Sequence, residues 1–235
     1  PESQLRTWAQ LIDEPGTPPS QARMLYPINK ASVSVLDKIV AAPRVSEVSL
    51  EWTRGWHESS DRARGYFVSA SDVPTDWNCV ILQGPHFTVA TPLYKQPNKS
   101  MENNLDTTVI LLDEMPKDFI PRTSYQPARA LSEFHAGYPQ WRGRSSSEYF
   151  RVAWRERAQP VKAVRALQSA LIPPGPTHVD SVHTFGQPDK SRDLSLVCGV
   201  SHSLVADFFI RITGCEHIKF AVWRQLPLPR GHHLE

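Results

Sequence analysis

The chain has 235 residues, of which 40% are hydrophobic, and this supports one large domain or two small lobes. No apolar run approaches the ~20 residues of a membrane span, and no signal-peptide pattern opens the sequence, so we expect no membrane partner. The formal net charge is only +2, and 21 prolines against 11 glycines predict many stiff turns. The three widely spaced cysteines, Cys79, Cys198 and Cys215, predict free thiols and a cytoplasmic location.

The first sixty residues predict a small, mostly helical lobe with a linker. A short amphipathic helix is expected around Leu5, Trp8, Leu11 and Ile12, followed by a proline-rich linker over residues 15–19. Ser32 is the expected cap of a second helix that runs to Ala42 and stops at Pro43. A strand is expected over residues 45–52.

The region 61–229 predicts one larger domain. Strands are expected over residues 66–68, 79–82, 107–112, 149–154 and 166–172, whereas residues 121–147 show no period and predict a loop. Residues 194–213 predict one long buried helix that ends at Gly214. The expected fold class is α/β (α+β): a mixed, largely antiparallel sheet, the N-terminal helical lobe and a buried C-terminal helix.

Both ends are expected to be boundaries of an excised fragment. The sequence starts at Pro1, and Leu234-Glu235 resembles a cloning scar before a purification tag. Residues 230–235 are therefore treated as a terminus outside the larger domain.

Positive charge is concentrated in residues 117–165, where ten Lys and Arg stand against four Asp and Glu. Eight of the ten are arginines, whose planar fork can hold a phosphate or a guanine edge with two hydrogen bonds. Aromatic residues interleave with them, and Arg151 shares its strand parity with Tyr149 and Ala153. A polyanion-binding face would leave this pattern, and so would aromatic core residues that arginines merely cover.

Catalytic motifs are not evident. Thr91-Pro92-Leu93-Tyr94 lacks the leading amide and second proline of a loop that holds a flipped adenine, and Pro116 interrupts the acidic run 113–117. His178, Asp180 and His183 are the nearest approach to metal-ligand spacing, and zinc is not expected.

Several segments resemble, in order, the C-terminal half of type IIG-like adenine-specific restriction–modification DNA methyltransferases. They are Trp56-His57-Glu58, the run 82–87, Pro121-Arg122-Thr123, the run 149–155, Ala170-Leu171-Ile172-Pro173-Pro174-Gly175 and the run 203–208. The resemblance covers most of residues 24–229. It implies a target recognition (specificity) domain that binds double-stranded DNA and is not catalytic in isolation.

The resemblance also implies what lies outside the chain. The partner would be the N-terminal methyltransferase domain of the parent protein, which would bind S-adenosylmethionine; no cofactor is expected in this fragment. We expect DNA to contact the loops at 94–95 and 178–184 and the arginine-rich span. The predicted DNA-binding residues are Arg122, Arg142, Arg144, Arg151, Arg155, Arg165, Tyr94 and Lys95.

Two other classes of function compete with DNA recognition. One is a protein-interaction module of a phage-defence complex, and the other is a degenerate nuclease or hydrolase lobe. The motif Trp56-His57-Glu58 is also open: a packed indole with hydrogen-bonded neighbours is the first interpretation, and a contact to DNA or to the missing domain is the second.

Overall fold

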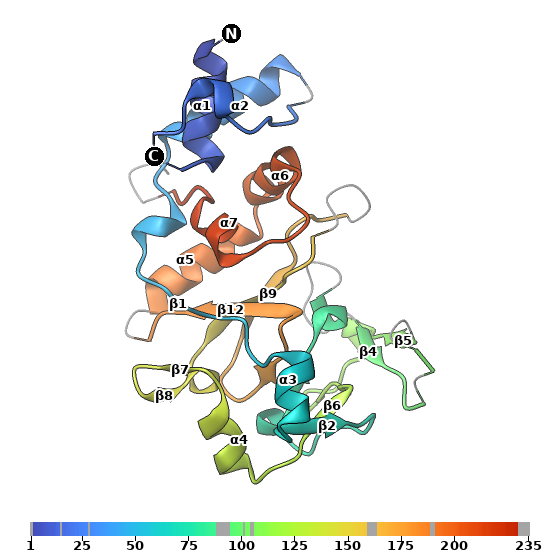
Figure 1. Ribbon diagram of the computed structural model, residues 1–235. Coiled ribbons are helices and arrows are strands. Elements are labelled where there is room, and N and C mark those ends of the chain that lie inside the picture. Colours follow the sequence, from blue (N-terminus) through green and yellow to red (C-terminus); the bar gives the residue numbers. More distant parts are fainter. Residues whose placement is uncertain are drawn as a thin grey trace.

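The computed structural model describes residues 2–14, 16–27, 29–87, 95–100, 102–103, 106–158, 164–188 and 191–229. A four-stranded antiparallel sheet forms its centre, in the order β1 (Glu51–Thr53), β12 (Val182–Gly186), β9 (Arg151–Arg155) and β10 (Ser169–Ile172). The helices from the two ends of the chain lie on one side of this sheet, and short strands, turns and two short helices lie on the other (Figure 1). The predicted mixed α/β class with largely antiparallel strands is confirmed.

The sheet is buried on both faces. Val152 and Trp154 of β9 pack with Phe185 of β12 in the helix-facing core, whereas Ala153 and Val182 pack in a second core on the opposite side. Every residue of β12 and four of the five in β9 are buried. A strand covered on both faces has no apolar-to-polar alternation, so its solvent exposure cannot be deduced from parity.

The helix-facing core joins the two ends of the chain. Helices α1 (Glu2–Ile12) and α2 (Lys30–Ala41) share this core with α5 (Ser191–Ser201), α6 (Leu204–Thr213) and α7 (Phe220–Arg224). Trp8 and Leu36 belong to the same buried cluster as Phe209. The first helix agrees with the prediction. The second begins earlier than expected, because Asn29 rather than Ser32 is the cap and accepts a hydrogen bond from the Ser32 amide at 2.9 Å.

The predicted helix over 194–213 is two helices. α5 and α6 meet at 62°, and Ser203 caps α6 by accepting a hydrogen bond from the Ala206 amide at 3.2 Å. α6 ends at Gly214 with φ +61°, as predicted. Within the described ranges, no single helix is long and apolar enough to cross a membrane; only this bent pair reaches the required length and composition together.

The prediction of a loop over 121–147 is wrong. This region contains β6 (Tyr125–Pro127), α4 (Leu131–Gly137) and a hairpin of β7 (Gln140–Trp141) and β8 (Arg144–Ser145). Only Phe134 of α4 is buried, so the helix carries no apolar periodicity that a sequence pattern could reveal. Phe134 packs on Trp56, with ring centroids 5.2 Å apart, and this tertiary contact stabilises the helix.

The remaining elements are short and lie mainly on the side of the sheet away from α5–α7 (Figure 1). They are α3 (Glu58–Ala63), β2 (Phe67–Ser69) paired with β6, β3 (Ile81–Leu82) paired in parallel with β11 (Thr177–His178), and the hairpin β4 (Lys95–Pro97) and β5 (Thr107–Val109). Three predicted strands are shorter than expected, because 3-10 turns occupy residues 45–47, 77–79 and 112–114.

Candidate nucleic-acid interface

Arg151 is fully buried, so the expectation that it lies on a solvent-facing surface is wrong. Its Nε donates to the Tyr149 carbonyl at 3.2 Å, Nη2 donates to the Pro176 carbonyl, and Nη1 has no hydrogen-bond partner. Burial lowers the pKa of its guanidinium, while the nearby Tyr138 hydroxyl opposes that change. The parity argument correctly grouped Arg151 with Ala153, but the second core covers that face.

Arg165 and Arg122 bind other parts of the protein. Arg165 Nη2 donates to the carbonyls of His202 and Ser203, both at 2.9 Å, and so closes the junction between α5 and α6. Its Nε lies 3.4 Å from Asp207. Arg122 Nη1 donates to the Pro97 carbonyl at 3.3 Å. Both side chains are only partly exposed, so these contacts favour a structural role over phosphate binding.

Arg142 and Arg144 lie on the β7–β8 hairpin. Arg142 stands in the two-residue turn with φ +51°, and it lies 3.8 Å from Glu51. Arg144 holds the Glu148 carboxylate through Nε at 2.9 Å and Nη2 at 2.7 Å. Both arginines are exposed and could also reach a phosphate.

The remaining predicted residues lie elsewhere. Lys95 belongs to β4, which lies on the opposite side of the molecule from the β7–β8 hairpin (Figure 1). Tyr94 lies outside the described residues. Arg155 is half-buried at the end of β9, and burial, together with the neighbouring Arg157, lowers its pKa. The structure therefore disperses the predicted set over several surfaces.

A cavity of about 630 Å³ brings together a different set of side chains. We name it the Trp52 cavity. It is formed where β1, the turn before β12, the end of β9 and the start of α7 converge. Its lining residues are Trp52, Arg54, Glu156, Asp180, His183, His217, Lys219, Phe220 and Ala221.

The walls of the Trp52 cavity are aromatic. Trp52 is 40% exposed, and its ring lies parallel to that of Phe220, with an interplanar angle of 8° and centroids 5.7 Å apart. His183 presents a third ring at 64° to Trp52 and is only 7% exposed. Its Nδ1 has no hydrogen-bond partner, and burial lowers its pKa, which favours a neutral imidazole.

Charged groups surround these rings. Arg54 and Lys219 are exposed, and so is Arg157, whose backbone pairs with that of His217 beside the cavity. Glu156 binds His217, with Oε1 and Nδ1 2.7 Å apart. Asp180 makes neither a hydrogen bond nor an ion pair with another described residue. The cavity thus combines flat apolar walls, an available carboxylate and cations near its mouth.

The motif Trp56-His57-Glu58 has a structural role, because all three side chains contact other parts of the protein. Trp56 is 2% exposed and contacts Tyr66, Phe67, Phe134 and Tyr138 in an aromatic cluster. His57 Nδ1 caps α3 by accepting from the Ser60 amide at 3.3 Å, and Glu58 accepts from the Tyr125 hydroxyl. The first interpretation of this motif, a packed indole with hydrogen-bonded neighbours, is confirmed, but the indole packs on residues of the larger domain and not within the N-terminal lobe.

His178 and His183 have separate environments. Both ring nitrogens of His178 have partners, the Val179 carbonyl and the Thr184 hydroxyl, and the residue is fully buried. Across the described ranges, no group of three or more His, Cys, Asp or Glu side chains is arranged to hold a metal ion.

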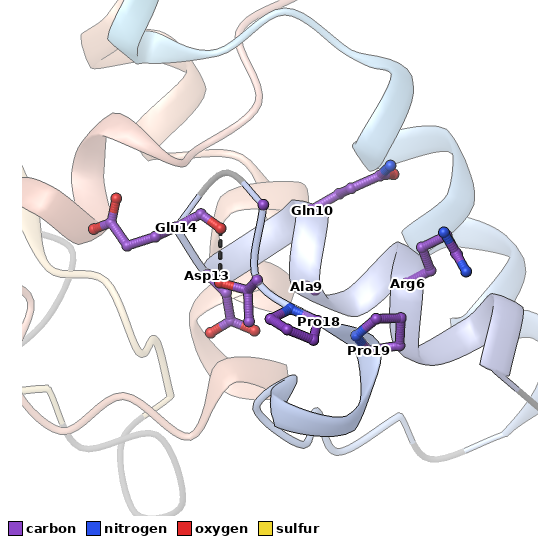
Figure 2. A pocket seen from close by; sticks show the side chains of 9 residues that line it. Arg6, Ala9, Gln10, Asp13, Glu14, Pro18 and Pro19 are labelled. Atoms are coloured by element: carbon purple, nitrogen blue, oxygen red, sulfur yellow. Dashed lines mark hydrogen bonds between the residues drawn. The ribbon is translucent and has the colours of Figure 1, made fainter.

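Two further cavities are weaker candidates for a functional site than the Trp52 cavity. One of about 470 Å³ lies between α1 and the turn after it (Figure 2). There, Asp13 is already paired with Arg23 at 2.5 Å. The other, of about 560 Å³, contains His135, which bonds the Ser147 hydroxyl at 2.8 Å and the Asn78 carbonyl at 3.0 Å. Ser147 is 1% exposed, so its hydroxyl is not available as a nucleophile. The hydrogen bond between His135 and Ser147 instead connects α4 to the turn after β8.

The residues of the Trp52 cavity were mostly missed from the sequence. Asp180 and His183 lie inside the predicted DNA-facing segment 178–184, but Trp52, Lys219 and Phe220 are far from it in the chain and have no spacing that would group them. No known family model matches this sequence, and no curated protein matches it significantly.

Proposed function

We propose that this chain is the target recognition domain of a restriction–modification adenine methyltransferase and binds double-stranded DNA without modifying it. The observation that carries the proposal is the Trp52 cavity, where aromatic walls and exposed cations meet on one surface. The ordered motifs of the sequence support the same class of protein.

The cations near the cavity suit a phosphate backbone. Arg54, Arg157 and Lys219 are exposed, and Arg155 lies beside Arg157 at the end of β9. Side chains of this kind set the position and register of a protein on a duplex, whereas base contacts give the sequence specificity. Arg155 does not itself line the cavity, and neither does any other predicted DNA-binding residue among those that the structure describes.

The catalytic steps would belong to the parent protein. Its N-terminal methyltransferase domain would bind S-adenosylmethionine and hold the target adenine, and this chain would select the site. The chain would act in the cytoplasm, where bacterial DNA is reached directly.

The test is a salt series with labelled duplex DNA of mixed sequence. Four phosphate contacts would give a log–log slope of affinity against salt of about −3 to −4. A flat dependence, or no binding at any salt concentration, would reject DNA recognition and favour a protein-interaction module. Cleavage of the duplex that a chelator abolishes would favour the nuclease lobe instead.

A further inference from the structure

The Trp52 cavity has properties that groove binding alone does not require. A protein recognises bases inside a duplex by hydrogen bonds to their edges, because neighbouring bases cover both faces of each ring. The cavity instead offers the parallel rings of Trp52 and Phe220 and the ring of His183. Aromatic walls of this kind stack on the faces of unpaired bases.

Resting on the proposed function, we infer that the Trp52 cavity binds one base turned out of the DNA duplex, a base other than the target adenine that the methyltransferase domain would hold. Its volume of about 630 Å³ lies within the roughly 300–1,000 Å³ of small-molecule sites. The base would stack on the exposed Trp52 ring, and Arg54 and Lys219 would hold its flanking phosphates.

The polar groups select the chemical class of base. The Asp180 carboxylate can only accept hydrogen bonds when ionised, and no described residue donates to it. Glu156 is also ionisable but already binds His217 at 2.7 Å. A free acceptor favours a base with an exocyclic amine, such as adenine, over thymine, whose single N3–H donor stands between two carbonyl oxygens.

His183 supplies the second observation at this site. It is 7% exposed, lines the cavity, and leaves Nδ1 without a partner. Buried polar atoms are rarely left unsatisfied. A bound base that shifts the Trp52 ring would give the imidazole room to reach a hydrogen-bond partner.

The experiment compares three labelled duplexes of one mixed sequence: fully paired, with one bulged adenine, and with one bulged thymine. A bulge removes the cost of unpairing, so a protein that binds an everted base should prefer it. We expect the adenine bulge to bind about 10-fold tighter than the paired duplex, and the thymine bulge to gain less. The readout is a ratio of affinities within one protein, so a general loss of DNA binding cancels.

Variants locate the effect. Trp52→Leu should bring the ratio of bulged to paired affinity close to one, and Trp52→Phe should keep most of it. Phe150→Leu is the matched control, because Phe150 is an aromatic that is 56% exposed and lies outside the cavity. If Trp52→Leu fails to fold, Asp180→Asn serves instead and should bring adenine and thymine bulges to similar affinity.

Each contrary outcome has one meaning. Equal binding of paired and bulged duplexes by the wild-type chain would reject the everted base and leave DNA recognition standing. A bulge preference that survives both Trp52→Leu and Asp180→Asn would move the base away from this cavity. Absence of binding to all three duplexes would reject the proposed function itself, and the inference with it.

Discussion

Gly55 lies so close to His178 that a β-carbon at position 55 would stand 2.2 Å from the His178 carbonyl oxygen. The backbone at Gly55 also has φ +71°, a conformation that L side chains rarely adopt. Because residue 55 has no β-carbon and adopts this conformation, the chain can pass from β1 into the aromatic cluster around Trp56. There, the Trp56 amide donates to the His178 carbonyl at 2.9 Å. Gly55 thus connects the central sheet to the aromatic cluster.

We expect Gly55→Ala to lower the free energy of unfolding by roughly 2–4 kcal/mol, from both backbone strain and displacement of His178. Gly65→Ala is the matched control, since Gly65 has φ +74° but nothing within 4 Å of its β-carbon position. It should cost only about 1 kcal/mol. Chemical denaturation measures both, and equal losses would show that the contact with His178 contributes nothing.

Replacing Arg151 should lower the stability of the fold without weakening DNA binding. Arg151→Met keeps most of the volume but leaves the carbonyls of Tyr149 and Pro176 without their donor. We expect a cost of roughly 1–3 kcal/mol and a lower melting temperature. The salt slope of DNA binding should stay constant, because a fully buried guanidinium cannot neutralise a phosphate. A shallower slope would restore Arg151 as a DNA contact.

Asp207 joins three parts of the chain. Its carboxylate accepts from the Ala166 amide at 2.5 Å and from Arg211 at 2.8 Å, and lies 3.4 Å from Arg165. Because the residue is only 8% exposed, we expect Asp207→Asn to cost roughly 2–4 kcal/mol in thermal or urea unfolding. Glu148→Gln breaks an exposed pair with Arg144 and should change little. Similar losses in both variants would contradict this role.

Stability should fall on mild acidification. Burial lowers the pKa of His86, His178 and His183 below the ordinary value near 6.5. The unfolded chain therefore binds more protons than the folded one below about pH 6.5, so the free energy of unfolding rises with pH in that range. Each histidine contributes at most about 1.4 kcal/mol per pH unit. Urea unfolding between pH 5 and 7.5 measures the slope, and stability that is constant or rises toward pH 5 would refute the assignment.

Two cations should carry part of the DNA affinity. Arg54→Ala and Lys219→Ala should each weaken binding to all sequences alike and reduce the magnitude of the salt slope by about one. Arg6→Ala removes an equal charge on α1, far from the Trp52 cavity, where Arg6 pairs with Glu2 at 2.7 Å. Anisotropy titrations at several salt concentrations compare the three. If Arg6→Ala has the same effect as the other two, net charge rather than this surface determines binding.

The sequence by itself determined the local structure wherever a signal repeats along the chain. The apolar spacing of Trp8, Leu11 and Ile12 identified α1, and Gly214 identified the end of α6. The mixed α/β class also followed from the order of strand-like and helical segments. These features depend on neighbours in sequence, so pattern and propensity are sufficient to find them.

Only the tertiary structure decided which arginines face solvent and where side chains converge. Arg151 and Arg142 look alike in the sequence, but packing buries the first and a hairpin turn exposes the second. The Trp52 cavity depends on pairing of β1 with β12 and on α7 lying against them, contacts between residues more than a hundred positions apart. Long-range pairing of this kind leaves no period in a single sequence, because it is set by the complete packing of the core.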